Sequence, residues 1–446
     1  MLKLIPKVLG MQPTMPYFAG KAASAIPFSF RPGVGKSFRT ASDRLAEYEQ
    51  GDGEARKDFI FRHTKAMATY AYDQTHFYRQ LYGDHGVDPH ELKHFDELSR
   101  LPVITKADLQ LVPMEQRSSD FGPRIEVNTG GTSGQPLSLY LSANSYGNEW
   151  AHMLPIWHRV GYRQTEPRLI FSGRTSGEDI IFYDGFRHGY VLNLSHGWDV
   201  LSDAIMKERR IRNIGVLHGY PSAIFDFVEW LQQEAHPLLK HWEKTVRILL
   251  LGSELPSPAK RKKVGEILSC KSVSWYGHTE RAVLAGEDGT HFEYHPMQSY
   301  SFAETIEAED GHHLVGTNYN NFSSPLVRYD TSDLVKPTYE NGIMTKFTIE
   351  GGRSGDYVID ANGQKIFLTS LIFGRHHKLF DNVYNLQVRQ THPGACEILY
   401  VPKEELSHEA ARAQFDGSGT SLSFSFRSLD NPIRTANGKL PLLVRE

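Results

Sequence analysis

The chain contains the run Val246-Arg247-Ile248-Leu249-Leu250-Leu251, which is followed at once by Gly252-Ser253. A short apolar run that ends in small residues is typical of a buried strand in a parallel sheet. A helical stretch near 257–268 comes next, as a strand–loop–helix unit requires. The pattern recurs at 168–173, at 214–222 (with a helix over 223–233) and at 273–277. The four units together predict an α/β fold with a parallel-rich sheet.

Ligands of such sheets collect beyond the carboxyl ends of the strands, so the loops that follow the strands are the first place to look for a site. Residues 40–100 are expected to be mostly helical. After about residue 350 the sequence pattern changes. We expect a flexible linker at Glu350-Gly351-Gly352-Arg353-Ser354-Gly355 and a small α+β unit in the residues that follow it. We therefore expect a large domain over 1–352 and a small domain over 353–446.

Composition excludes several classes of protein. Hydrophobic residues make up 40% and charged residues 23% of the 446, an ordinary globular balance. The net charge is 49 − 52 = −3, which argues against a nucleic-acid binder or an anionic-membrane binder. No stretch approaches about 18 consecutive apolar residues, so no membrane span is expected, and the first 18 residues do not read as a signal peptide. The two cysteines, Cys270 and Cys396, fit a reducing compartment, for which the cytoplasm is the default.

A glycine-rich and hydroxyl-rich loop lies between the strand-like segments 125–127 and 137–141. Its sequence is Asn128-Thr129-Gly130-Gly131-Thr132-Ser133-Gly134-Gln135-Pro136. Three glycines let backbone N–H groups turn toward an anion, and three hydroxyls add donors. A polar hairpin turn is the alternative interpretation. Gly33-Val34-Gly35-Lys36-Ser37 ends like a phosphate-binding P-loop but has Phe30 where that motif needs glycine, so we interpret it as a solvated turn.

Four further segments carry groups suited to chemistry. In Trp275-Tyr276-Gly277-His278-Thr279-Glu280 an aromatic ring beside a glycine can lie against a flat base, and a carboxylate can hold Mg²⁺. Pro325-Leu326-Val327-Arg328-Tyr329-Asp330-Thr331-Ser332-Asp333 is expected to be a strand that leads into a turn with two carboxylates, which suit a ribose diol. Segment 352–366 is expected to be a linker entering a hairpin, and 434–439 a turn with a lysine. Exposed turns without a function remain the alternative for each segment taken alone.

The order of these segments is more specific than any one of them. The chain resembles the acyl-adenylate-forming superfamily of acyl-CoA synthetases, adenylation domains and luciferases. Within it the chain is similar to phenylacetate–CoA ligase and its relatives in polysaccharide gene clusters. The resemblance runs from about residue 60 to the end and rests on 129–136, 251–254, 276–280, 328–333, 352–356 and 435–439.

The resemblance implies a role for each matching position. The phosphates of ATP would be gripped by Thr129, Gly130, Gly131, Thr132, Ser133 and Gly134. The adenine pocket would be bordered by Gly252, Ser253 and Glu254, and Tyr276, beside Gly277, would stack on the base. Thr279 would touch the α-phosphate and Glu280 would ligate Mg²⁺. Asp333 would hold the ribose hydroxyls with help from Arg353, and Lys439 would be the mobile catalytic lysine of the small domain.

The chain departs from the family pattern at three places. Gln135 stands where a lysine is common, which removes one positive charge from the triphosphate grip. Gly355 stands at the hinge, where an aspartate or lysine is usual, and glycine tolerates the φ/ψ change of a domain swing. No cysteine follows the 276–280 segment, and His291 with His295 are too few ligands, so we predict no structural zinc.

The carboxylic-acid pocket is expected between the strand ends and the loop before the magnesium motif. The candidates are His218, Gly219, Tyr220 and Pro221, and also Ser172, Gly173 and Arg174. An arginine there favours an acidic or sugar-acid substrate, although a solvated or structural Arg174 fits equally well.

Three functions compete on this reading. The leading one is an ATP- and Mg²⁺-dependent ligase that activates a carboxylic acid as its adenylate and passes the acyl group to coenzyme A. A second would pass the acyl group to an amine on a sugar or amino acid. A third is a non-catalytic nucleotide-binding protein, against which the presence of Glu280, Asp333 and Lys439 argues. The acid, the acceptor and the oligomeric state, with a homodimer left open, are not determined by the sequence.

Overall fold

The computed structural model describes residues 15–128, 137–172, 179–194, 196–351, 357–363, 365–368, 371–372, 377–417, 420–434 and 441–445. Contacts within the chain divide it into two compact units. The larger contains most residues up to 348, and the smaller contains 332–336 and the chain from 349 onward. In the described residues, no helix combines the length and the apolar character needed to cross a membrane.

The helices of the larger unit are α2 (Tyr17–Ser24), α3 (Gly35–Gln50), α4 (Gly53–Gln74), α5 (His76–Asp84), α6 (Lys106–Gln110), α7 (Asn144–His158), α8 (Trp198–Lys207), α9 (Arg209–Arg212), α10 (Pro221–Gln233), α11 (Pro237–Thr245) and α12 (Pro258–Leu268). Local chemistry explains their starts. Asp52 caps α4 by accepting a hydrogen bond from the Ala55 amide, and α10, α11 and α12 each begin with proline, whose missing N–H is not needed at a first helical position.

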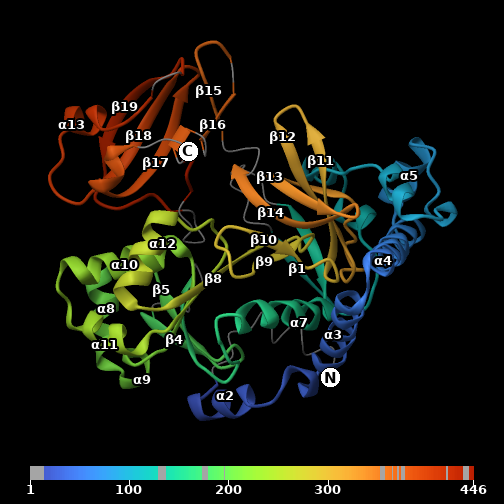
Figure 1. Cartoon of the computed structure of the whole chain (residues 1–446), viewed down its shortest axis with the longest axis horizontal. Coiled ribbons are helices and arrows are strands. Elements are labelled where there is room, and N and C mark those ends of the chain that lie inside the picture. Colours follow the sequence, from blue (N-terminus) through green and yellow to red (C-terminus); the bar gives the residue numbers. More distant parts are fainter. Residues whose placement is uncertain are drawn as a thin grey trace. The chain divides into compact units, whose positions relative to one another are not determined.

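The strands up to residue 351 are β1 (Arg124–Asn128), β2 (Ser138–Ser142), β3 (Arg168–Ser172), β4 (Ile181–Asp184), β5 (Gly189–Asn193), β6 (Val216–Gly219), β7 (Ile248–Leu251), β8 (Lys271–Gly277), β9 (Leu284–Glu287), β10 (Tyr294–Pro296), β11 (Ser301–Ala308), β12 (Gly311–Asn318), β13 (Tyr329–Glu340) and β14 (Ile343–Gly351). Among the described residues, twelve of these strands form one sheet in the order β11-β12-β13-β14-β10-β9-β8-β7-β6-β3-β5-β4 (Figure 1). The neighbours β5, β3, β6, β7 and β8 run parallel, and β9 pairs with β8 antiparallel. The predicted α/β class and its four parallel strands are therefore confirmed.

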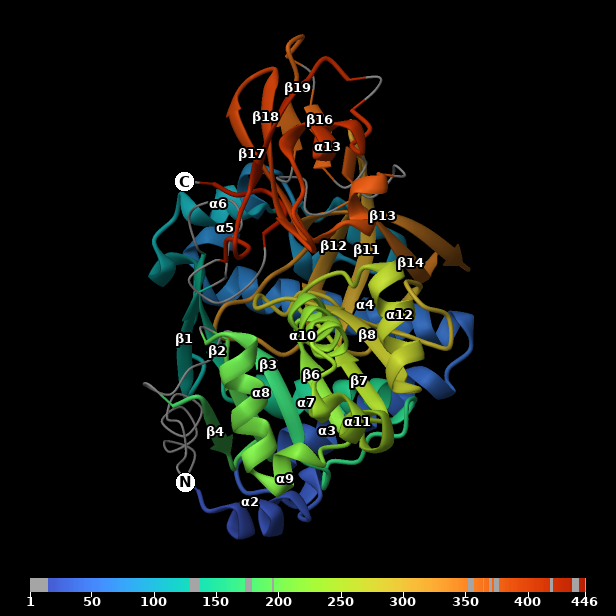
Figure 2. The same ribbon diagram turned by 90° about the vertical axis from the view of Figure 1, so that its left-hand side faces the viewer.

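The parallel strands are covered on both faces, as their continuous apolar runs require. On one face Leu217, Leu249 and Leu251 pack against α8, α10, α11 and α12. On the other face the alternate residues Val216 and Leu250 pack against α7 (Figure 2). The helix α7 therefore covers the second face of the sheet.

A separate core joins the N-terminal helices to the antiparallel part of the larger unit. Buried side chains of α4 and α5 pack with Leu139 and Leu141 of β2 and with Tyr329 of β13. The predicted helical character of 40–100 is confirmed by α3, α4 and α5. The strands β1 and β2 pair antiparallel, from Arg124 opposite Ser142 to Asn128 opposite Ser138, so the strand-like segments that flank the glycine-rich loop are confirmed as strands.

Two sequence predictions are wrong in detail. The segment 33–37 is not a solvated turn throughout. Gly35 begins α3, and Val34 is buried in a core that includes Phe28 and Trp157. Residues 325–328 are not a strand: β13 begins only at Tyr329, and Asp330 and Asp333 lie in that strand rather than in a turn. The Arg328 carbonyl accepts a hydrogen bond from the Ile104 amide, and the Asp330 amide donates to the Ile104 carbonyl, so Ile104 bridges the start of β13.

The smaller unit is built from β15 (Tyr357–Ile359), β16 (Lys365–Phe367), β17 (Val383–His392), β18 (Ala395–Pro402), α13 (His408–Ala413) and β19 (Ser423–Ser428). The strands β15 and β16 form the predicted antiparallel hairpin. The strands β17, β18 and β19 form a second sheet, in which β18 and β19 are parallel. The buried side chains of Val388, Ile398 and Tyr400 form its core, with Ala411 of α13 beside them.

Candidate active site

The carboxyl ends of β3, β6, β7 and β8 lie side by side. Phe171 is level with Gly219, Gly219 with Leu251, and Leu251 with Ser274. The ladder continues past the strand ends, since the Tyr220 amide donates to the Phe171 carbonyl at 2.9 Å and the Gly252 amide donates to the Gly219 carbonyl at 3.1 Å. The predicted residues His218, Gly219, Tyr220, Gly252, Tyr276 and Gly277, together with Ser172, therefore meet along one edge of the sheet.

Two glycines at this edge are required by geometry. Gly219 has φ +135°, and a Cβ there would lie 1.9 Å from the Phe171 carbonyl oxygen. A Cβ on Gly252 would lie 2.3 Å from Cζ2 of Trp275. The first glycine lets two strands approach closely, and the second receives an aromatic ring against its backbone.

The loop after β7 is tied to the helix after β6. Glu254 Oε2 accepts a hydrogen bond from the Ser222 amide at 3.2 Å, in the first turn of α10. A carboxylate is favoured there by the unpaired amides and the positive end of the helix dipole. Ser253 is exposed and has φ +72°. Glu254 thus fixes the loop and leaves the Ser253 side chain at the surface.

The predicted magnesium segment forms the turn between β8 and β9. Tyr276 is buried, and its ring meets Phe347 edge-on at 5.6 Å. Gly277 and Thr279 are exposed, whereas the side chains of His278 and Glu280 are each only 5% exposed. The His278 Nδ1 atom lies 3.1 Å from Glu280 Oε2, and the Tyr329 hydroxyl donates to Glu280 Oε1 at 3.4 Å. The turn therefore presents Gly277 and Thr279 outward and holds the carboxylate beneath them.

Sequence reasoning missed an aromatic cluster on the α7 face of this edge. The rings of Trp157, His218 and Trp275 lie within 5.1–5.7 Å of one another, centroid to centroid. Trp157 comes from α7, and the buried Arg168 places Nη1 3.2 Å from Nδ1 of His218. Only the apolar periodicity of 144–158 could have indicated that α7 covers this face, and that pattern does not identify its partner.

Arg328 and its neighbours on β13 have structural partners. The Arg328 guanidinium holds both oxygens of Glu304 and donates to the carbonyls of Ser99 and Leu101. Asp330 accepts from His313, which also bonds Asp310. Burial alone lowers the pKa of His313, but the hydrogen bonds and charges of these two aspartates raise it above its usual value. Asp333 lies on β13 and is 9% exposed.

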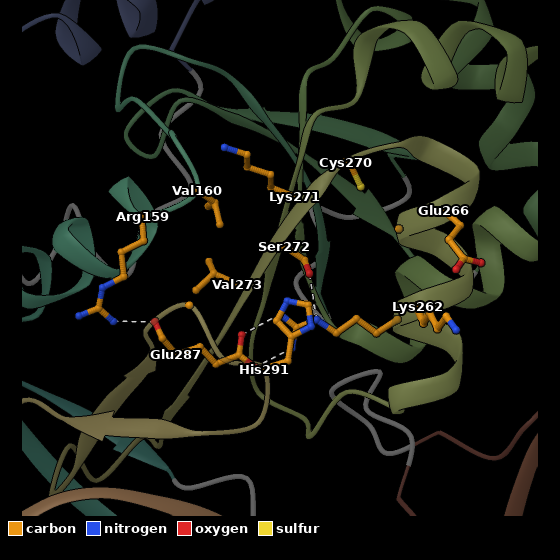
Figure 3. A pocket seen from close by; sticks show the side chains of 13 residues that line it. Arg159, Val160, Lys262, Glu266, Cys270, Lys271, Ser272, Val273, Glu287 and His291 are labelled. Atoms are coloured by element: carbon orange, nitrogen blue, oxygen red, sulfur yellow. Dashed lines mark hydrogen bonds and ion pairs between the residues drawn. The ribbon is translucent and has the colours of Figure 1, made fainter.

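A hollow of about 400 Å³ lies at the opposite, amino end of β8 (Figure 3). Glu287 holds Arg261 through both carboxylate oxygens and accepts from the amides of Ser274 and Phe292. Burial raises the pKa of the Cys270 thiol at its rim to about 12, which keeps that thiol protonated. This hollow is at the other end of the strand from the predicted site.

The remaining predicted residues lie outside the described part of the chain. They are Thr129, Gly130, Gly131, Thr132, Ser133, Gly134, Gln135, Gly173, Arg174, Arg353, Gly355 and Lys439. Within the described ranges, no group of three or more histidine, cysteine, aspartate or glutamate side chains is arranged to hold a metal. A Mg²⁺ ion at a nucleotide site needs only one or two carboxylates, with phosphates and waters completing its shell, so Glu280 fits such an ion.

No model of a known protein family matches the chain. Over 312 residues it is 25% identical to a phenylacetate–coenzyme A ligase from Thermus thermophilus, a match that covers 62% of this chain and 64% of that ligase. The match thus spans slightly less than two thirds of the length of that relative. A phenylacetate–coenzyme A ligase from Pseudomonas putida is 23% identical over 336 residues, which cover 68% of this chain and 71% of that one.

Solved structures show the same fold. A 2-hydroxyisobutyryl-CoA ligase in the postadenylation state, in complex with R3-HIB-AMP, matches with a TM-score of 0.62 at 14% identity, over 88% of this chain and 90% of that chain. An acyl acid amido synthetase matches with a TM-score of 0.51 at 12% identity, over 82% of this chain and 84% of that chain. At these identities the likeness concerns the fold alone. The chain is therefore similar in sequence to two phenylacetate–coenzyme A ligases and shares its fold with a 2-hydroxyisobutyryl-CoA ligase.

Proposed function

We propose that the protein is an ATP-dependent ligase that activates a carboxylic acid as its acyl-adenylate and transfers the acyl group to coenzyme A. One observation carries the proposal. The 218–220, 252–254 and 276–280 segments, far apart in the chain, meet at the carboxyl edge of the sheet. The names of the two sequence relatives, both phenylacetate–coenzyme A ligases, support the same reaction.

In the nucleotide half of the site, each residue takes the role that the family resemblance implies for it. Gly252, Ser253 and Glu254 border the adenine, and Tyr276 stacks on it beside Gly277. Thr279, which is exposed, contacts the α-phosphate. Asp333 and Arg353 hold the ribose, and 129–134 grip the β- and γ-phosphates with Gln135 in place of a cation.

Glu280 is the residue that would hold Mg²⁺. The ion, when bound, neutralises charge that develops on the phosphate oxygens during attack at phosphorus. The carboxylate of Glu280 is buried and accepts hydrogen bonds from His278 and Tyr329. Its orientation is therefore already fixed before a cation binds. The donor chemistry suits a hard cation, since carboxylate oxygen is the ligand that Mg²⁺ prefers.

Two steps complete the reaction. An oxygen of the substrate carboxylate attacks the α-phosphorus, and the bond to the bridging oxygen breaks, so pyrophosphate leaves with the electron pair. The Lys439 ammonium stabilises the negative charge that grows in this step. The coenzyme A thiolate then attacks the acyl carbonyl and AMP leaves. A swing of the small domain about Gly355 separates the two steps, and the acid lies near Ser172, Arg174 and 218–220.

An exchange assay tests the first step. Purified protein is incubated with ATP, Mg²⁺, labelled pyrophosphate and a panel of aromatic, fatty, sugar and amino acids. We expect label to enter ATP with at least one class of acid and only when acid is present. Absence of exchange with every acid would favour a non-catalytic nucleotide-binding protein.

A second assay identifies the acceptor. With an active acid, coenzyme A consumption and thioester formation are measured, and amines replace coenzyme A in parallel samples. The fold is shared with an acyl acid amido synthetase, so an amine acceptor is the second candidate. We expect thioester; amide formed without coenzyme A would support the second candidate instead.

The two thiols and the need for ATP favour a cytoplasmic location.

A further inference from the structure

His278 is held at both of its ring nitrogens. The Val283 amide donates to Nε2 at 3.2 Å, and Nδ1 lies 3.1 Å from Glu280 Oε2. An amide N–H can only donate, so Nε2 is the acceptor and the ring proton is on Nδ1. His278 therefore donates a hydrogen bond to the carboxylate of Glu280, and the backbone of Val283 fixes the tautomer that makes this donation.

The other oxygen of Glu280 is held from a different strand. The Tyr329 hydroxyl on β13 donates to Oε1 at 3.4 Å, and the Tyr329 ring is stacked on His278 with a centroid distance of 6.5 Å. The next residue along the chain, Arg281, lies toward Glu149 at 3.6 Å. Both oxygens of Glu280 thus have neutral donors that fix the plane of the carboxylate.

We infer that His278 is a positioning residue, which sets the orientation of Glu280 for a divalent cation bound with the nucleotide. The inference rests on the proposed function, because that function makes Glu280 the cation ligand. Mg²⁺ and Mn²⁺ accept little deviation from octahedral geometry, so a carboxylate that is already oriented binds them more tightly than one that must first be ordered. Loss of a hydrogen-bond partner behind a ligand typically weakens metal binding about 10- to 100-fold.

His278 also closes the β8–β9 turn through Val283, so a purely structural role must be separated from the positioning role. Two substitutions divide the two contacts. In His278→Asn the amide nitrogen takes the place of Nδ1, so the donation to Glu280 is kept and the reach to Val283 is lost. In His278→Gln the side chain reaches as far as Nε2, so the acceptor for Val283 is kept and the donor to Glu280 is lost.

Binding of Mn²⁺ is measured by electron paramagnetic resonance in the presence of ATP and without acid, so the result does not depend on turnover. We expect His278→Gln to bind Mn²⁺ about 10- to 100-fold more weakly than wild type. His278→Asn stays within about threefold of wild type. His312→Asn, at an exposed histidine of β12, is the matched control and leaves binding unchanged.

The outcomes separate this inference from the proposed function. Wild-type affinity in His278→Gln, or equal weakening in both variants, would overturn the positioning role alone, provided that Glu280→Gln weakens Mn²⁺ binding. If Glu280→Gln binds Mn²⁺ as wild type does, both the cation role of Glu280 and the inference fail. Far-UV circular dichroism checks folding, and if His278→Gln does not fold, Tyr329→Phe replaces it: a loss of Mn²⁺ affinity supports the orientation of Glu280 and unchanged affinity contradicts it.

Discussion

The contact between Gly252 and Trp275 gives a quantitative test of the strand edge. In Gly252→Ala the new methyl would lie 2.3, 2.6 and 2.8 Å from Cζ2, Cε2 and Cη2 of the indole. Real Cβ atoms do not approach so closely, so the ring must move. It has little room, because Trp157 and His218 lie 5.5 and 5.7 Å from it, centroid to centroid. Such overpacking destabilises by about 1–3 kcal/mol, and the blocked retreat argues for the upper part of that range.

A double-mutant cycle isolates this contact. Trp275→Ala removes the half-buried ring and with it the clash, so Gly252→Ala in that background is expected to change the free energy of unfolding by less than about 0.5 kcal/mol. The coupling free energy is then about 2 kcal/mol. Urea unfolding is followed by tryptophan fluorescence, which reports on the larger unit because all six tryptophans lie between 150 and 275.

Two results would contradict this reasoning. If Gly252→Ala destabilises both backgrounds equally, the ring does not occupy the space above Gly252. If Gly252→Ala is as stable as wild type, the edge is more open than the described geometry. Leu255→Ala, at an exposed residue of the same loop, is the control and is expected to lie within about 0.5 kcal/mol of wild type.

Three further predictions concern chemistry and pH. Lys439→Ala is expected to slow acid-dependent pyrophosphate exchange by about 100-fold or more while thioester formation from a supplied acyl-adenylate continues; Lys244→Ala, at an exposed lysine of α11, is the control, and an unchanged exchange rate would refute the role. Glu280→Gln is expected to raise the Mg²⁺ concentration at half-maximal exchange by about tenfold or more. The control is Glu309→Gln, in an exposed turn, and a wild-type magnesium profile in Glu280→Gln would refute the role of Glu280 as a ligand. His313 has a raised pKa in the folded state, so its stabilisation is complete below the unfolded value of about 6.5 and is lost as pH rises through the folded value. The unfolding free energy of wild type is therefore expected to fall over this window more steeply than that of His313→Gln, and parallel slopes would exclude the contribution.

The parallel strands were predictable because their signal is local. An apolar run such as 248–251 has only one burial environment that fits it, and Gly252 after it marks the strand end. The same reasoning located 218–220 and 276–280 at one edge, because the carboxyl ends of parallel strands share a side of the sheet. Strand boundaries were harder to predict: the 325–328 segment contains the apolar Leu326 and Val327, but it is not a strand. At the start of β13 the backbone bonds to Ile104, which is far away in sequence.

The contacts that complete the site were not predictable from the sequence. Trp157 and Trp275 contact each other because of where α7 lies along the strands of the sheet, and the periodicity of the sequence does not specify that position. The bond between His278 and Glu280 depends on the reversal of the chain after β8, which the residue types alone do not specify. The ion pair between Arg261 and Glu287 joins α12 to β9 across 26 residues, and no rule of sequence spacing predicts such a pair.

The change from parallel to antiparallel pairing at β8 has a consequence for the order in which the protein assembles. The β8–β9 hairpin closes a short loop, which takes about 1–10 μs in isolated hairpins, whereas β6, β7 and β8 can join only after their connecting helices have folded back. When the complete chain refolds, the turn with Glu280 can therefore form before the parallel strands beside it are paired. Substitutions that slow the docking of α10 or α12 are accordingly expected to slow refolding from denaturant, while the refolded molecules have the wild-type fold.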